Sequence, residues 1–252
     1  MLVPSRYAKV LALKKAFDSL DIPNVLVDSG CGDGFYLQQI EAGRKIGLDL
    51  IPPESGKGIK YIKSDVSSTP LNDRDCDCLL SLDVIEHIDE DDRALDEFYR
   101  VLNDDGILVI TTPNNSEFMP YRLFRVMFRL DIAKMHRVWK HVRPGYSKEE
   151  LVALIKRHDF EVMSHRSIYQ PLSRVFELVY IIPMMISERV YSPEERARWL
   201  RKRKGFLLRT LEGLHDFLFR LILGPIIKRI ENTQDNGFFH LIICKKATCD
   251  KR

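Results

Sequence analysis

Cysteine is scarce in this sequence, and its spacing lacks the pairs that mark a disulfide framework or a zinc site. The 252 residues include 5 cysteines, an odd number, and none of them lies in a C-x-x-C pair. We therefore expect reduced, structural thiols, as in a cytosolic protein. The 7 histidines are scattered, with neither an H-x-x-x-H pair nor histidine–cysteine spacing, so the sequence predicts no metal site.

Long apolar runs are absent as well. The two longest, 178–186 and 221–227, are much shorter than the ~20 residues that span a bilayer, and Pro183 interrupts the first. Lysines interrupt the N-terminal apolar stretch, which argues against a signal peptide. These absences predict a cytoplasmic protein without a transmembrane helix, whose surface could still associate with a membrane.

The net charge of +3 conceals an uneven distribution of charge along the chain. Residues 1–118 carry 12 lysines and arginines against 22 acidic residues, so the remaining residues carry an excess of 13 positive charges. Hydrophobic residues make up 45% of the sequence, which is enough for a globular core. We interpret the asymmetry as two halves with different partners, the first acidic and the second basic.

Short β-type runs alternate with helical runs in the acidic half, which predicts an α/β fold with a mostly parallel sheet. A turn is expected at 104–106, and a capping box at 147–150 opens a helix that continues to about 158. The other expected helices are 35–42 and 88–103, and the expected strands are 24–30, 44–50, 60–66, 75–84, 107–113, 160–168 and 238–247.

A glycine-rich loop follows the first expected strand. Its glycines, Gly30, Gly32 and Gly34, permit a tight turn with positive φ and let a ligand approach the backbone closely. Asp49 ends the second expected strand, where a carboxylate can accept both hydroxyls of a ribose. Asp65 ends the third, where it could accept the amino group of an adenine. Acids at the carboxyl ends of adjacent parallel strands face one crevice, so this pattern predicts a nucleotide site.

The charge beside the loop indicates which nucleotide binds. The spacing is G-x-G-x-G, whereas the dinucleotide fingerprint is G-x-G-x-x-G, and Asp28 precedes the first glycine. Asp28 would repel a pyrophosphate but would attract a cation. S-adenosylmethionine (SAM) carries an ammonium and a sulfonium and no phosphate, so the sequence favours SAM over NAD.

Five motifs of the acidic half resemble the successive motifs of class I SAM-dependent methyltransferases, most closely the small-molecule branch of ubiquinone-type O-methyltransferases. They are VLVDSGCGDG, IGLDL, SDV, SLDVIEHI and LNDDGILVITTPN, and the likeness covers 22–168 and 238–247. The resemblance implies a Rossmann-like, doubly wound sheet of seven mostly parallel strands, with an antiparallel last strand and a helical insertion. The turn at 103–106 departs from the family's Lys-Pro-Gly-Gly, at a place away from the expected cofactor contacts.

The resemblance also implies the residues that contact SAM. Asp28, Gly30, Gly32 and Gly34 would line its methionine end, Asp49 would hold the ribose with Leu50 by the adenine, Asp65 and Val66 would contact the adenine edge, and Ser81 and Asp83 would lie near the sulfonium.

Two histidines are candidates for a general base, which a hydroxyl acceptor would need. His87 follows the fourth expected strand, and His141 lies in a segment that often covers the active site of similar enzymes. Each has a simpler interpretation: His87 as a helix-start residue that packs the cofactor loop, and His141 as a solvated histidine among basic neighbours.

Two additions distinguish the chain from a bare methyltransferase domain, which we expect at 1–168 and 237–252. Residues 116–146 are basic and aromatic and are expected to cover the active site, and 169–236 form a helical, basic insertion. Within the insertion, 196–229 combine arginines, a tryptophan and a leucine stripe, which suits either a lid or an interfacial helix on an anionic membrane. RNA binding is a third, less favoured interpretation.

The sequence thus predicts methyl transfer from SAM to a small-molecule or lipid-like acceptor, at oxygen. An NAD-dependent oxidoreductase and a catalytically idle SAM-binding module, which would contact a membrane or a partner, are the alternatives. Nucleic acid is not an expected acceptor, since no N-P-P-Y motif follows the fourth expected strand, where the chain reads S-L-D-V.

Overall fold

The structure is a computed structural model that describes residues 4–56, 58–115, 141–170, 216–217, 219–231 and 237–247. The chain divides into two compact units, Ala12–Ser167 with Phe238–Arg252, and Met1–Leu11 with Ile168–Gly237. Most of the expected active-site cover and most of the basic insertion, including the arginine cluster at 196–204, lie outside the described residues.

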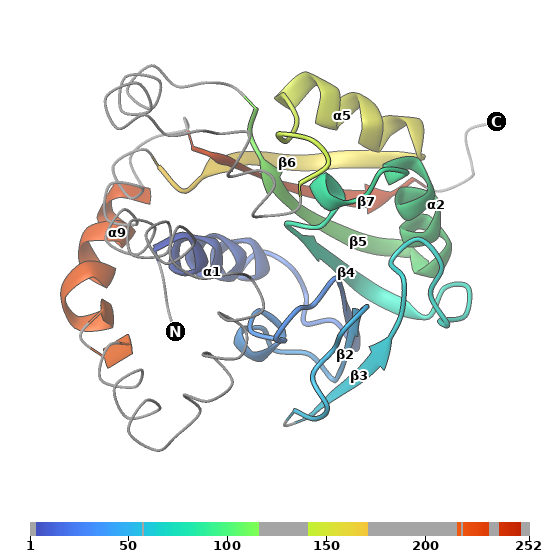
Figure 1. Ribbon diagram of the computed structural model, residues 1–252, viewed down its shortest axis with the longest axis horizontal. Helices are drawn as coiled ribbons and strands as arrows, with labels where there is room; N and C mark the ends of the chain where they lie inside the picture. Colours follow the sequence, from blue (N-terminus) through green and yellow to red (C-terminus); the bar gives the residue numbers. More distant parts are fainter. Residues whose placement is uncertain are drawn as a thin grey trace, which may run out of the picture. The chain divides into compact units, whose positions relative to one another are not determined.

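The larger unit is built on a seven-stranded sheet, coloured from blue to red along the chain in Figure 1. Its strands are β1 Val25–Ser29, β2 Arg44–Asp49, β3 Ile59–Lys63, β4 Cys76–Leu82, β5 Leu102–Pro113, β6 Phe160–Ile168 and β7 Phe239–Lys246. Their order is β3-β2-β1-β4-β5-β7-β6; the pairs from β3 to β5 are parallel, and β7 is antiparallel to β5. This arrangement confirms the Rossmann-like sheet with an antiparallel last strand.

The strand order reverses between β1 and β4, and this reversal determines where a ligand can bind. From β1 the chain continues outward to β2 and β3, then returns to β4 on the other side of β1. The loops after β1 and β4 therefore leave the sheet in opposite directions and open a crevice at the carboxyl ends of the strands. Leu26 and Val27 of β1 and Leu80 of β4 are each at 0% exposure, so both strands lie in the core.

Helices α2, Asp91–Val101, and α5, Lys148–Arg157, pack against the sheet around a shared core. Leu95 and Phe98 of α2 and Leu151 of α5 are fully buried, because the apolar residues recur every three or four positions. The two helices are also joined by charge: Arg157 and His158, at the end of α5, both contact Asp92 of α2.

Two expected elements differ from the structure. The expected helix at 35–42 is only a short 3₁₀ turn, Leu37–Gln39, because the backbone becomes extended at Ile40. The expected turn at 104–106 lies inside β5 as an irregularity, since Leu102 pairs with Cys76 and Ile107 with Cys78.

The cysteines are free thiols, as the sequence predicts, at the four positions that the structure describes. Cys31, Cys76, Cys78 and Cys244 are all buried. Burial raises the pKa of Cys31 and of Cys76 to about 12, so neither forms a reactive thiolate near neutral pH.

The smaller unit contains the start of α1, Pro4–Phe17, a π-helical turn, Phe219–Leu223, and α9, Gly224–Glu231. The rings of Tyr7 and Phe219 meet edge to face with centroids 5.6 Å apart. Glu231 accepts hydrogen bonds from the backbone amides of Tyr169 and Gln170, each at 2.8 Å. Among the described residues, no helix is both long enough and apolar enough to cross a bilayer.

Candidate functional site

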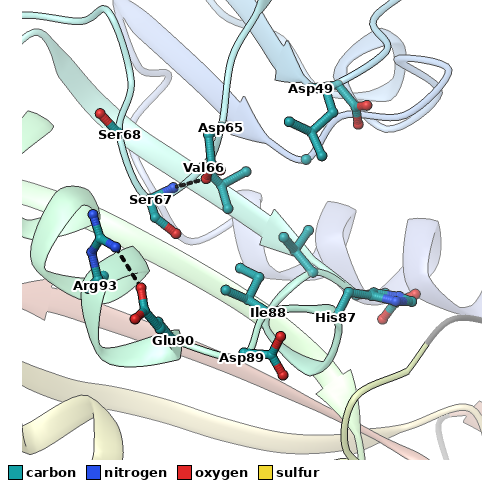
Figure 2. A pocket seen from close by; sticks show the side chains of 14 residues that line it. Asp49, Asp65, Val66, Ser67, Ser68, His87, Ile88, Asp89, Glu90 and Arg93 are labelled. Carbon is teal, nitrogen blue, oxygen red and sulfur yellow. Dashed lines mark hydrogen bonds and ion pairs between the residues drawn. The ribbon is translucent and has the colours of Figure 1, made fainter.

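A cleft of about 670 Å³ lies at the carboxyl ends of the parallel strands, within the larger unit (Figure 2). Seven of the residues expected to contact the cofactor or the acceptor line it: Gly30, Asp49, Leu50, Asp65, Val66, Asp83 and His87. The sequence did not single out the others, which are Ser67, Ser68, Val84, Ile88, Asp89, Glu90 and Arg93. Val84 and Ile88 stand in the motif SLDVIEHI, whereas Ser67, Ser68, Asp89, Glu90 and Arg93 belong to no quoted motif, so only the fold brings these five to the cleft.

The end of β2 holds the glycine loop in place. The Asp49 carboxylate accepts hydrogen bonds from the backbone amides of Gly32 and Ile51, both at 2.9 Å. The amides of Gly30 and Cys31 donate to the Leu48 carbonyl, at 2.8 and 2.9 Å. Asp49 thus has a structural task at the loop as well as a place in the cleft.

The three glycines of the loop are required for different reasons. All have positive φ, +87° at Gly30, +53° at Gly32 and +70° at Gly34. A Cβ at Gly30 would lie 2.4 Å from a methyl of Val84, and one at Gly34 would lie 1.9 Å from the Tyr61 hydroxyl, whereas Gly32 faces open space. Gly34 therefore makes room for Tyr61, and only Gly30 of the three lines the cleft.

Asp28, at the end of β1, is a buried carboxyl in an acidic environment. It is 1% exposed, and neither carboxyl oxygen has a hydrogen-bond partner among the residues that the structure describes. Burial, and secondarily the charges of Asp49 and Asp33, raise the pKa of Asp28 to about 8. Such a group is most stable beside a positive charge, which suits a cationic ligand and opposes a pyrophosphate.

The adenine side of the cleft combines a polar turn with exposed apolar side chains. Asp65 accepts a hydrogen bond of 2.8 Å from the backbone amide of Ser67, and Val66 lies between them, as Figure 2 shows. Leu50 is 61% exposed at the rim. A carboxylate acceptor next to apolar surface is the combination that an adenine requires.

The loop after β4 brings Asp83 into the cleft in an unusual backbone conformation. Asp83 has a φ of +58°, which is uncommon for a residue other than glycine. Thr111 of β5 holds it there, because the Thr111 hydroxyl donates to the Asp83 carboxylate and the Thr111 carbonyl accepts from the Asp83 amide, each at 2.9 Å. Ser81, two residues earlier in β4, is fully buried and does not line the cleft.

The two candidate histidines meet at the rim of the cleft. The rings of His87 and His141 lie edge to face, with centroids 4.6 Å apart. Glu86, which the sequence analysis did not single out, is fully buried beside them, and one ligand atom from each of the three residues lies within 4.8 Å of the others. Sequence spacing could not reveal this group, because 54 positions separate the histidines.

Hydrogen bonds from the segment 141–147 hold the histidines together. The amides of Val142 and Arg143 donate to the Glu86 carbonyl, at 3.0 and 3.4 Å. The Arg143 guanidinium donates to the carbonyls of Ile88 and Asp89, at 2.9 and 3.0 Å, and pairs with the Asp91 carboxylate. The Tyr146 hydroxyl also donates to Asp91, at 2.7 Å, so this set of contacts, the 143–146 clamp, fixes His141 against His87.

The chain resembles known methyltransferases in sequence over its first half. Residues 27–110 match a family model described as a methyltransferase domain. A tRNA (carboxymethyluridine(34)-5-O)-methyltransferase from Arabidopsis thaliana is 30% identical over 42% of this chain and 28% of its own length. A protein named as a SAM-dependent methyltransferase from Mycolicibacterium smegmatis is 30% identical over 38% of this chain and 41% of its own length. The chain thus spans less than half the length of these relatives.

The fold as a whole resembles that of solved methyltransferases. A SAM-dependent methyltransferase from Thermotoga maritima superposes with a TM-score of 0.52 over 95% of this chain and 88% of its own, at 18% identity. Together with the matching domain and the sheet order, this likeness agrees with the glycine loop and the acidic strand ends. Residues 27–110 thus match a methyltransferase domain, and the sheet around them has the fold of solved SAM-dependent methyltransferases, which supports S-adenosylmethionine as the cofactor.

Proposed function

We propose that the protein transfers the methyl group of SAM to an oxygen atom of a small-molecule or lipid-like acceptor. The environment of Asp28 is the observation that carries this proposal. A buried carboxyl without a hydrogen-bond partner, next to Asp49 and Asp33, retains its proton in the free protein and would release it to become a negative partner when a cationic ligand binds. An NAD-dependent oxidoreductase would bring a pyrophosphate to the same place, where these carboxylates would repel it.

The residues at the cleft would contact SAM at three of its parts. Gly30 and the buried Asp28 would hold the methionine end, Asp49 the ribose hydroxyls, and Asp65 with Val66 and Leu50 the adenine. Asp83 would lie near the sulfonium, since it follows β4 and lines the cleft beside His87. Ser81 would support this end from within β4.

The reaction is an in-line displacement. The acceptor oxygen forms a bond to the methyl carbon, and the electron pair of the breaking carbon–sulfur bond remains on sulfur, which gives S-adenosylhomocysteine. The protein has to align the acceptor, the methyl group and the sulfur, and to exclude water. A hydroxyl acceptor also loses a proton, and His87 or His141 at the rim would accept it.

The choice of an oxygen acceptor is supported by the name of one relative. The Arabidopsis relative is named for methylation at oxygen. Its name also makes RNA a second candidate acceptor, which the basic charge of the second half would favour. Incubation with SAM and either total lipid extract or tRNA, followed by mass spectrometry of the products, separates the two. SAM binding without turnover on any extract would instead indicate an idle binding module.

The cofactor assignment is tested with Asp49→Ala. Calorimetry on the intact protein should detect SAM binding, and the affinity for SAM should be at least 100-fold lower in the variant. Both ribose hydroxyls lose their acceptor, and the glycine loop loses the carboxylate that holds the Gly32 amide. The matched control, Glu41→Ala, removes an exposed carboxylate that does not line the cleft and should bind SAM normally. Unchanged SAM affinity in the folded Asp49 variant would refute the assignment, as would thermal stabilisation by NAD in place of SAM.

A further inference from the structure

We propose that Glu86, His87 and His141 bind a divalent transition-metal ion at the rim of the cofactor cleft. The three residues present a carboxylate and two imidazoles, a mixed set that suits ions such as Zn²⁺ or Mn²⁺. None of them is among the residues that we assign to SAM, so the ion would form a site of its own next to the methyl donor.

The geometry of the three side chains is close to that of a metal site. Their ligand atoms all lie within 4.8 Å of one another. Two atoms that each coordinate one zinc ion at about 2.1 Å lie about 3 to 3.5 Å apart. Small side-chain rotations would therefore bring all three atoms to bonding distance from one ion, without movement of the backbone.

The fold holds these three residues in place independently of any substrate. Glu86 is fully buried, and one of its carboxylate oxygens accepts a hydrogen bond of 3.1 Å from the Thr112 hydroxyl of β5. His87 is the last residue of the 3₁₀ turn Ile85–His87, and it lines the cleft. The 143–146 clamp adds His141 from a segment distant in sequence. Hydrogen bonds that orient a ligand in this way are typical of metal sites.

Three protein ligands leave coordination positions open, which is the arrangement of catalytic rather than structural metal sites. His87 is exposed and lines the cleft, so an ion bound to it would be accessible from the cleft, where the acceptor must meet the methyl group. A metal ion there would bind the acceptor through its hydroxyl oxygen and lower the pKa of that hydroxyl, so the proton would pass to solvent and the two histidines would act as ligands in place of a general base. This use of the ion rests on the proposed function, whereas binding of the ion does not.

The test measures metal binding by the intact protein. After treatment with EDTA and dialysis, the protein is equilibrated with Zn²⁺ or with Mn²⁺, and bound metal is counted by mass spectrometry. We expect one ion per chain, and we expect His87→Gln, His141→Gln and Glu86→Gln each to weaken binding at least 10-fold. His158→Gln is the matched control, since this histidine contacts Asp92 and Asp96 outside the cleft.

A second measurement identifies the ligands directly. Co²⁺ should give visible absorption bands in the wild-type protein, and these bands should shift in both histidine variants but not in His158→Gln. SAM titration of the same samples shows whether each variant is folded and separates this inference from the cofactor assignment. If the protein binds SAM but retains neither Zn²⁺ nor Mn²⁺, or if the three variants bind metal as the wild type does, the metal site is refuted.

Discussion

The two ends of the cleft are built in different ways. At the cofactor end, Asp28, Asp49 and Asp65 each lie at or just after the carboxyl end of a strand, and the parallel sheet brings them to one edge. At the rim, His141 comes from a distant segment, and the 143–146 clamp is needed to place it beside Glu86 and His87. The first arrangement follows from strand order alone, and the second depends on particular long-range contacts.

This difference teaches where each end is vulnerable. The cofactor end brings several carboxyl groups together, which lowers the stability of the fold when no cation is bound. Substitution of one of these residues should therefore change ligand binding and the pH dependence of stability. At the rim, Arg143 pairs with the opposite charge of Asp91 and donates hydrogen bonds to backbone carbonyls, so substitution of Arg143 should affect the placement of one segment. Three substitutions, ordered by the size of the expected effect, test this comparison.

Asp28→Asn should have the largest effect on stability. The folded-state pKa of Asp28, about 8, lies above its value of about 3.9 in an unfolded chain, so the folded protein retains a proton that the unfolded chain loses. Stability should therefore fall as pH rises from about 4 to about 8. We expect the variant, which carries no charge there, to unfold at a temperature at least about 4 °C higher than the wild type at pH 8, without ligand.

The same substitution should weaken SAM binding, because the cation loses its carboxylate. Calorimetry of the wild type below pH 8 should show release of up to one proton per SAM bound. Asp33→Asn, at an exposed neighbour of the loop, is the control and should change the pH dependence much less. If the stability of Asp28→Asn changed with pH between 5 and 8 as steeply as that of the wild type, burial of the Asp28 carboxyl would not be what destabilises the cofactor end.

Arg143→Met should have an intermediate effect, through the clamp. The side chains of Arg143 and Asp91 are 27% and 12% exposed, so the variant leaves a mostly buried carboxylate without its guanidinium. Urea denaturation should show a loss of about 2 kcal/mol in the free energy of unfolding. Arg74→Met, which breaks the exposed pair with Asp104, is the control and should cost less than about 1 kcal/mol. Equal losses in the two variants would show that the clamp does not hold the rim.

Ser147→Ala should have the smallest effect, because it changes a local contact just after the clamp. The Ser147 hydroxyl accepts from the Glu150 amide at 3.1 Å, and the Glu150 carboxylate accepts from the Ser147 amide at 2.7 Å, which completes the capping box. We expect a loss of about 1 kcal/mol in the free energy of unfolding, with unchanged SAM affinity. Ser55→Ala, at an exposed position, should lose nothing measurable. Loss of SAM affinity in the Ser147 variant would show that the helix α5 and the cofactor end are coupled.

The comparison also shows which parts of the fold a sequence can predict. The strands and the capping box of α5 were predicted correctly, because apolar periodicity and capping are local patterns. The helix at 35–42 and the turn at 104–106 were wrong. In both places the pattern was short: the backbone is extended at Ile40, and pairing of Leu102 with Cys76 places the expected turn inside β5.

For the site, the structure bears on where the predicted residues lie, whereas their roles toward SAM stay predictions. Seven predicted residues line the cleft. Gly34 is not among them, and a glycine is needed there because the Tyr61 hydroxyl occupies the space of a side chain. Asp28 is buried beneath the surface. Residues of the adenine side such as Ser68 and Arg93 have no local signal, since they become neighbours only when β3 and α2 are in place. The expected cover at 116–140 and the basic cluster at 196–204 remain predictions.

The sequence alone determined the class of fold and the chemistry of the cofactor end, because a parallel sheet collects its strand ends at one edge whatever its details. It also shows an acidic first half and a basic second half. Only the tertiary structure decided that Glu86 and two histidines 54 positions apart form one group. The physical reason is that their contact depends on the 143–146 clamp, whose hydrogen bonds join segments that no local periodicity relates.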